Sequence, residues 1–247
     1  MPPWIIALIA VAAVGGLGFL WIESRPQHKF IDAAGNADIG KLRAWIDKGV
    51  EVNLPGFMGL TALNAAVQEG RLENVKLLLE RGADPNLISM KQLPLGLAAS
   101  ENKNEIVACL LEHGADFNKP SFLKVTPLQE AMTAGNCEAM KMFIDRGADV
   151  NGKSSFGDPL LSSLLLTLVG TRGEDGRAKL RAMVELLLDH GANPNVRMTT
   201  GVPAIMIAIE DPLTLRLMVE NGSITQTSYD GIDLEPEIQA ALATLEP

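Results

Sequence analysis

The hydrophobic positions of the chain follow two different patterns. Residues 4–22 form one stretch of nineteen positions without a charged side chain. Beyond residue 28, apolar residues instead recur at intervals of three and four, which is the spacing of a helix with one buried face. Two of these series of apolar residues end at Gly82 and Gly191. Glycine readily takes the left-handed conformation that commonly terminates a helix. The pattern predicts one long apolar helix followed by a series of short amphipathic helices.

The apolar stretch at residues 4–22 is long enough to cross a bilayer. As a helix it would extend roughly 28 Å, close to the thickness of the hydrocarbon layer. Trp4 and Trp21 lie near its ends, where indole rings favour the headgroup region, and neither a basic n-region nor an A-x-A-like cleavage site accompanies it. We therefore predict a single N-terminal transmembrane helix and a single-pass membrane protein. A cleaved signal peptide and a buried helix are the alternatives.

The flanking charges bear on the side of the membrane. No Lys or Arg precedes the stretch, whereas Arg25, Lys29 and Lys41 follow it. Because basic residues are retained on the cytoplasmic side, this difference favours a cytoplasmic domain. So few charges decide the orientation that a periplasmic or other extracytoplasmic domain is the close alternative.

A five-residue phrase that begins with Gly and ends with Asn organises the rest of the chain. Its glycines are 33, 32, 33 and 44 residues apart. The copies are Gly-Val-Glu-Val-Asn at 49–53, Gly-Ala-Asp-Pro-Asn at 82–86, Gly-Ala-Asp-Phe-Asn at 114–118, Gly-Ala-Asp-Val-Asn at 147–151 and Gly-Ala-Asn-Pro-Asn at 191–195.

Further phrases stand where each unit's first helix should begin: Gly-Leu-Thr-Ala-Leu-Asn-Ala-Ala at 59–66 and Thr-Pro-Leu-Gln-Glu-Ala at 126–131. Together with the period of 33, they resemble the ankyrin repeat. The resemblance covers about residues 28–222 and implies an all-α solenoid of stacked helix-turn-helix units with β-hairpin fingers. Because one repeat alone cannot bury its apolar faces, the units are expected to stack into a continuous core.

The ends of the predicted helices carry residues suited to capping. Side-chain oxygens or prolines stand at the starts of first helices, where they satisfy or remove an unpaired N–H group. His113 and His190 each precede a phrase glycine, at a position filled by Lys or Arg in the other copies. We interpret them as cations at helix C-termini rather than as catalytic or metal-binding groups. The predicted start residues are Thr61, Thr126 and Asp158 as caps, and Pro94, Pro127 and Pro159 at the first helical position.

Three regions follow from these patterns. Residues 1–27 are the predicted anchor and juxtamembrane linker, 28–234 an ankyrin repeat domain of about six repeats with atypical first and last copies, and 235–247 a C-terminal capping helix. One repeat has eleven extra residues. The glycines and charges of 170–177 place this insertion near 165–178, in the turn between two helices.

Composition excludes several classes of function. A net charge of -9 with thinly spread basic residues argues against nucleic acid binding and would speed encounter with a basic partner. Two Cys and three His are too few for a metal cluster or a disulfide framework. No triad, paired carboxylates or phosphate-binding loop is present in the sequence. We therefore expect no catalytic residues, metal, cofactor or small-molecule substrate.

The finger segments between each phrase Asn and the next helix contain large apolar side chains. In ankyrin repeats, which this chain resembles, fingers project toward the concave binding face and are usually polar. An apolar residue on each finger would form an exposed stripe of the kind found at protein interfaces. The alternative is that each one packs on a neighbouring finger and is buried. The predicted partner-binding residues are Phe57, Met58, Met90, Phe122, Leu123, Phe156 and Met198.

These features favour a non-catalytic module that is tethered to a membrane and binds an unidentified protein through its fingers and inner helices. Resemblance to bacterial single-span ankyrin proteins suggests a neutralising, immunity-type partner or an accessory partner of a membrane-active protein. A structural, self-associating membrane scaffold is the alternative. An enzyme is the least favoured class, because an exposed loop offers no desolvated site.

Overall fold

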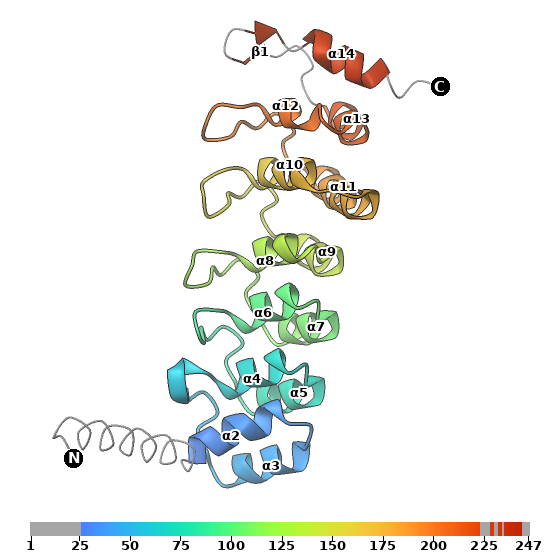
Figure 1. Ribbon diagram of the computed structural model, residues 1–247. Coiled ribbons are helices and arrows are strands. Elements are labelled where there is room, and N and C mark those ends of the chain that lie inside the picture. The colour runs from blue at the N-terminus through green and yellow to red at the C-terminus, as the bar shows by residue number, and fades with distance from the viewer. Residues whose placement is uncertain (1–25, 223–227, 230–231, 234, 244–247) are drawn as a thin grey trace, which may run out of the picture. The chain divides into compact units, whose positions relative to one another are not determined.

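The computed structural model describes residues 26–222, 228–229, 232–233 and 235–243 (Figure 1). The chain divides into two compact units, Met1–Asp116 and Phe117–Pro247. Both consist of antiparallel helix pairs joined by finger loops, which confirms the all-α ankyrin-type solenoid fold.

The described part of the first unit contains three helix pairs. Helix α2 packs against α3 and α4, α4 packs against α5 and α6, and α5 packs against α7. The core between them is apolar, with Phe30, Leu42, Leu78 and Leu110 fully buried. The helices are α2 (Pro26–Gly35), α3 (Ile39–Asp47), the 3-10 turn η1 (Phe57–Gly59), α4 (Ala62–Gln68), α5 (Leu72–Glu80), α6 (Pro94–Ser100) and α7 (Asn104–Glu112).

The second unit repeats this arrangement and ends in a short hairpin and a helix. Its core includes Met140, Phe143, Leu165 and Leu187, all fully buried. Helix α14 packs against α13 and buries Ile238 completely. The elements are α8 (Pro127–Ala134), α9 (Cys137–Ile144), α10 (Leu160–Gly170), α11 (Glu174–Asp189), α12 (Ala204–Ala208), α13 (Pro212–Glu220), the antiparallel pair β1 (Ser228–Tyr229) and β2 (Ile232–Asp233), and α14 (Glu235–Ala243).

Caps or prolines mark where three of the first helices, α4, α6 and α8, begin. Thr61 accepts a hydrogen bond from the Asn64 N–H, and Thr126 forms a reciprocal capping box with Gln129. Pro94 and Pro127 occupy the first helical position, as predicted. The prediction for Asp158 and Pro159 is wrong. Helix α10 begins at Leu160 without a side-chain cap, because the Asp158 carboxylate instead accepts the N–H and hydroxyl of Thr199 in the following finger, at 2.7 and 2.9 Å.

In four of the five phrases, the final Asn donates a hydrogen bond to the glycine carbonyl of the next repeat. In the first unit, the Asn53 amide donates to the Gly82 carbonyl at 2.9 Å and its oxygen accepts the Asp84 N–H at 2.8 Å. In the second unit, Asn151 does the same with Gly191 and Asn193, at 3.0 and 2.8 Å. This clamp needs a donor and an acceptor on one short side chain, which explains why the phrase ends in Asn rather than Asp.

The eleven inserted residues are helical, not the turn that the glycines suggested. Helices α10 and α11 have 11 and 16 residues, three and eight more than α8 and α9. Only residues 171–173 remain between them. Of the three glycines, Gly173 precedes α11 with a φ of 94°, whereas Gly170 and Gly176 lie inside helices. Two of the three glycines are therefore accommodated within helices, despite the low helix propensity of glycine.

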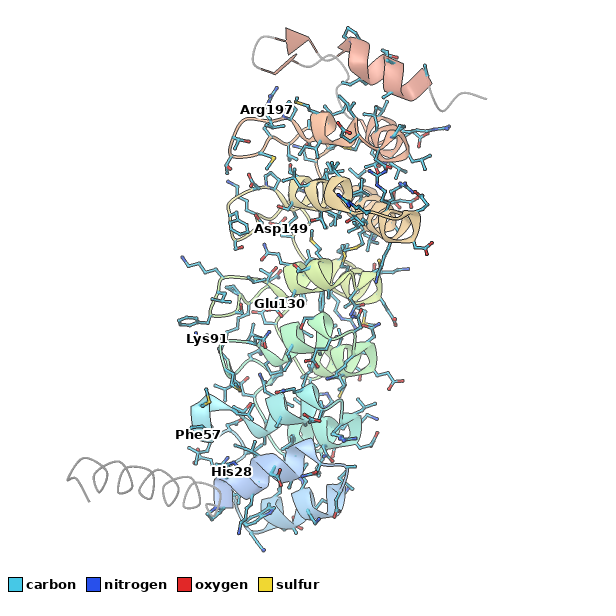
Figure 2. All side chains as sticks on the ribbon, viewed as in Figure 1. His28, Phe57, Lys91, Glu130, Asp149 and Arg197 are labelled. Carbon is cyan, nitrogen blue, oxygen red and sulfur yellow. The ribbon has the colours of Figure 1, made fainter. Side chains whose placement is uncertain are left out.

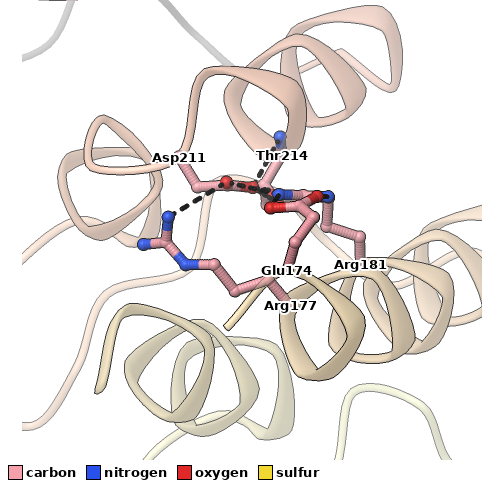
Figure 3. Close-up of polar contacts among 5 residues, drawn as sticks. All are labelled: Glu174, Arg177, Arg181, Asp211 and Thr214. Carbon is pink, nitrogen blue, oxygen red and sulfur yellow. Dashed lines mark hydrogen bonds and ion pairs between the residues drawn. The ribbon is translucent and has the colours of Figure 1, made fainter. Parts of the chain in front are cut away.

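An ion-pair cluster fixes the lengthened α11 to the start of α13 (Figure 3). Arg181 donates to both carboxylate oxygens of Asp211, at 2.8 and 3.0 Å, and to Glu174 at 2.6 Å. Asp211 also caps α13 by accepting the Thr214 N–H at 3.2 Å. Burial alone would raise the pKa of the Asp211 carboxyl, but the hydrogen bonds from Arg181 and Thr214 together lower it. The inserted residues of α11 therefore help to stabilise its contact with the next helix pair.

The predicted localisation requires correction. Residues 4–22, on which the transmembrane prediction rests, lie outside the described residues. Among the helices that the structure describes, none has the length and apolar character needed to cross a bilayer. The longest, α11, has 16 residues and carries several charged side chains. A single-pass membrane protein, with its domain on the cytoplasmic or the opposite side, is thus not supported.

Candidate functional site

The finger loops present apolar side chains to solvent. They comprise residues 54–60 and 87–93 in the first unit and 119–125, 152–158 and 196–202 in the second. In each unit they lie on the side of the first helices, opposite the second helices such as α5 and α9 (Figure 1). These loops are not regular β-hairpins: three of them are closed by one antiparallel bridge each, Ser89 with Gln92, Lys153 with Pro159 and Arg197 with Pro203.

Six of the seven predicted finger residues are exposed. The three phenylalanines are the largest, with exposed fractions of 56% for Phe57, 66% for Phe122 and 87% for Phe156. Figure 2 shows Phe57 on the finger side of the first unit, together with Lys91. The alternative in which these side chains are buried by neighbouring fingers is therefore wrong for the six exposed residues. The other exposed residues are Met58, Met90 and Leu123, whereas Met198 is half-buried.

Several finger tips adopt a left-handed backbone without glycine. Met90 and Lys91 have φ values of 49° and 72°, and they form a two-residue turn whose flanking residues exchange two hydrogen bonds of 2.9 Å. Met58 and Lys124 also have positive φ, at 56° and 59°. A side chain in this conformation costs about 1–2 kcal/mol relative to an ordinary backbone. The fingers thus retain large side chains at positions where the backbone favours glycine.

Buried polar side chains hold the fingers in place. Ser89 is almost completely buried; its hydroxyl accepts the Thr61 N–H at 3.0 Å and donates to the Gly59 carbonyl at 3.1 Å. In the second unit, the Gln129 amide donates to the Lys153 carbonyl at 2.5 Å. The sequence alone did not reveal these contacts, because a single Ser or Gln carries no distinctive signal. They support a rigid display of the exposed residues.

The structure also exposes apolar residues that the sequence analysis missed. Leu54 and Ile88 lie within finger loops and are 45% and 40% exposed. Leu166 on α10 and Leu213 on α13 are exposed to a similar degree outside the fingers. Leu54 and Ile88 extend the apolar finger surface of the first unit. Leu166 and Leu213 are similarly exposed but lie outside the fingers, so they can serve as control positions for mutation.

The titratable groups form no recognisable catalytic arrangement within the described part of the chain. Burial raises the pKa of the Glu130 carboxyl to about 7, and its Oε2 has no hydrogen-bond partner among the described residues. No second carboxylate or histidine pairs with it there. No group of three or more potential metal ligands occurs among the residues that could be searched.

The two histidines have the predicted structural position. His113 and His190 are the C-cap residues of α7 and α11. In each, the ring Nδ1 lies 2.8 Å from the carbonyl oxygen four residues earlier, that of Cys109 or Leu186. A carbonyl can only accept, so Nδ1 donates and satisfies an end group of the helix. Both histidines therefore lie at the helix C-termini where the sequence placed them.

Comparison with protein families identifies the repeat. Residues 87–154 match the model for ankyrin repeats in three copies, and residues 58–89 match the single ankyrin repeat. The repeats at residues 58–154 are ankyrin repeats. The described helix pairs and finger loops of the chain are the parts expected of that fold.

Similar ankyrin repeat proteins occur in bacteria. An ankyrin repeat-containing protein of Treponema pallidum is 30% identical over 178 residues, which cover 72% of this chain and 46% of that protein. The ankyrin repeat protein YahD of Escherichia coli is 27% identical over 184 residues, covering 73% of this chain and 88% of that protein. This chain thus spans about half the length of the Treponema relative.

Solved structures of ankyrin repeat domains share the fold of this chain. The ankyrin repeat domain from Acinetobacter baumannii is 25% identical, with a TM-score of 0.70, and the match covers 79% of this chain and 98% of that domain. Ankyrin repeat proteins are generally protein-interaction modules and typically non-catalytic, and these similarities indicate no enzyme family.

Proposed function

We propose that this chain binds a protein partner through its finger loops. The observation that carries the proposal is the exposure of large apolar side chains on successive fingers, above all Phe57, Phe122 and Phe156. Burying such side chains against a partner releases water from apolar surface, at roughly 25 cal/mol per Å². Aromatic residues held in fixed positions lose little conformational entropy on binding, so they are efficient contact residues.

The proposed contact residues are the seven finger residues of the sequence analysis, with Leu54 and Ile88 added in the first unit. Met198 contributes least, since it is already half-buried. The scaffold holds the fingers through buried polar contacts such as those of Ser89. A neutralising or accessory role toward the partner stays a prediction.

Affinity capture tests this proposal. The full chain and a variant with Phe57, Met90, Phe122 and Phe156 all changed to Ser would be used as baits. A control carries Leu166→Ser and Leu213→Ser, which alter exposed leucines outside the fingers. We expect partners to be retained by the native chain and the control and lost by the finger variant, while all three show the same helical circular dichroism.

Self-association is the competing explanation for an exposed apolar surface. Sedimentation of the same three proteins over a range of concentrations distinguishes it. A native chain that dimerises, and a finger variant that does not, would favour a structural scaffold. Equal capture by all three baits would contradict binding through the fingers.

A further inference from the structure

The charge of the finger loops is opposite to the charge of the chain. Five of the 21 basic residues lie in the fingers, but only one of the 30 acidic residues does, Asp158. That carboxylate already accepts two hydrogen bonds from Thr199. The fingers therefore present cations beside their apolar side chains, although the chain as a whole has a net charge of -9. The finger cations are Lys91, Lys119, Lys124, Lys153 and Arg197.

In the second unit, these cations are placed next to the exposed aromatic residues. Lys124 follows Phe122 by two positions, Lys153 precedes Phe156 by three, and both lysines are exposed. Neither makes an ion pair with any residue that the structure describes. Figure 2 shows Arg197 on the last finger of the same unit. An unpaired cation at the rim of an apolar surface favours carboxylates on whatever binds there.

A groove beside Phe156 adds an apolar pocket to this surface. It has a volume of about 410 Å³ and lies between α8 and α10, with Met132, Leu160 and Leu164 among its lining residues. Its helical hydroxyls are already satisfied: Thr133 donates to the Gln129 carbonyl at 2.9 Å, and Thr167 to the Ser163 carbonyl at 3.0 Å. The groove can therefore hold an apolar side chain against Met132, Leu160 and Leu164, with the Ser154 hydroxyl, unpaired among the described residues, at its wall.

One further cation lines this groove. Lys179 of α11 lies across Gly135, the left-handed residue that ends α8. Its position near a helix C-terminus is electrostatically favourable, and its ammonium group makes no ion pair with the described residues. A carboxylate on the partner, next to the apolar side chain in the groove, would form an ion pair with the Lys179 ammonium group.

We infer that the second unit binds a segment of a partner protein in which apolar side chains alternate with acidic ones. An apolar side chain occupies the groove beside Phe156, and neighbouring carboxylates pair with Lys124, Lys153 and Lys179. This inference rests on the proposed function and reverses the expectation from net charge, which favoured a basic partner. Opposite charge on the fingers and the rest of the surface orients an acidic segment toward the fingers.

A random peptide display library, selected on the immobilised full chain, tests the inference. We expect enriched peptides to combine Asp or Glu with Leu, Ile or Phe. Binding of an enriched peptide, measured by fluorescence anisotropy, should weaken about tenfold or more on Phe156→Ser, and about tenfold when Lys124, Lys153 and Lys179 are all changed to Gln. Changing its acidic residues to Asn or Gln should have a similar effect. The controls are Leu213→Ser and Lys141→Gln, the latter at an exposed lysine of α9 outside the fingers, and both should change binding less than twofold.

The outcomes separate this inference from the proposed function. Enrichment of basic peptides, or of neutral ones unaffected by the triple lysine variant, would overturn the acidic preference and leave finger binding intact. Enriched peptides that bind the Phe156→Ser variant as tightly as the native chain would show that the binding site does not include Phe156. That result would count against both the proposed function and the acidic preference. Failure to enrich any peptide, or tighter binding of a single-stranded oligonucleotide at the same fingers, would also overturn the inference.

Discussion

Gly170 and Gly191 belong to the same repeat and differ in backbone conformation rather than in available space. A Cβ at either position would meet no atom within 4 Å. Gly191 has a φ of 85°, which other residues rarely adopt, whereas Gly170 lies at the end of α10 with an ordinary φ. The phrase glycine is therefore required by its backbone and not by crowding.

Substituting alanine at these two positions should have opposite effects. Gly191→Ala is expected to destabilise the second unit by about 1–2 kcal/mol, because it places a Cβ in the left-handed region. Gly170→Ala should be neutral or stabilise by up to about 1 kcal/mol, since alanine favours helix. Urea unfolding monitored by circular dichroism measures both, and equal effects would contradict the conformational explanation.

Glu130 should make stability depend on pH. Its pKa is about 7 in the folded chain against an ordinary value of 4.5, because burial disfavours the charged form. Between these values the folded state binds more protons than the unfolded state, so stability falls as pH rises from 4.5 and the loss is complete above 7. Glu130→Gln should gain stability over the native chain as pH increases from about 5.5 to 8.5. Urea unfolding at several pH values measures this effect. If the difference in free energy of unfolding between the variant and the native chain stays constant over this range, Glu130 titrates normally.

At the scale of elements, the insertion depends on the pairing between Arg181 and Asp211. The Asp211 side chain is 3% exposed and that of Arg181 is 13% exposed, so neither is well hydrated. Because Asp211 also caps α13, one carboxylate links the lengthened α11 to the next helix pair. Removing the cation would leave a buried charge whose remaining partners, among the residues that the structure describes, are Thr214 and the more distant Arg177.

Arg181→Ala is expected to destabilise the second unit by about 3–5 kcal/mol, the usual cost of breaking a buried ion pair from one side. Arg216→Ala serves as the control, since its pair with Glu220 on α13 is more than half exposed, and should cost about 0.5 kcal/mol. Thermal and urea unfolding provide the comparison. Similar losses in the two variants would mean that the cluster contributes no more than a surface pair.

At the scale of the whole molecule, the periodic features could be predicted from sequence and the exceptions could not. The recurring glycine phrase identified the repeats, and the spacing of apolar residues identified their helices. The helical insertion was missed because three glycines favoured a turn, whereas its stability comes from Arg181 and Asp211, 30 residues apart. Asp158 was predicted to cap a helix, but its carboxylate binds Thr199, which is 41 residues away in the next finger.

The apolar finger residues were predicted from their positions between each phrase Asn and the next helix, but their exposure required the structure. A sequence does not reveal whether a phenylalanine on a loop folds onto its neighbour or points to solvent. The same limit applies to the fingers' charge, which becomes informative only once Lys124 and Lys153 are found exposed and outside the ion pairs of the described residues. Whether a finger side chain is exposed or paired therefore depends on contacts with residues distant in sequence, which local sequence patterns do not reveal.

Titration calorimetry with a captured partner tests directly whether the fingers form the binding surface. The affinity of the partner is measured for the native full chain and for its Phe156→Ser and Leu213→Ser variants. We predict that Phe156→Ser raises the Kd about tenfold or more, equivalent to about 1.4 kcal/mol, whereas Leu213→Ser changes it less than twofold. Both side chains are exposed and apolar, and only Phe156 lies on a finger. Equal affinities for all three forms, or a greater loss with Leu213→Ser, would contradict the claim that the fingers form the binding surface.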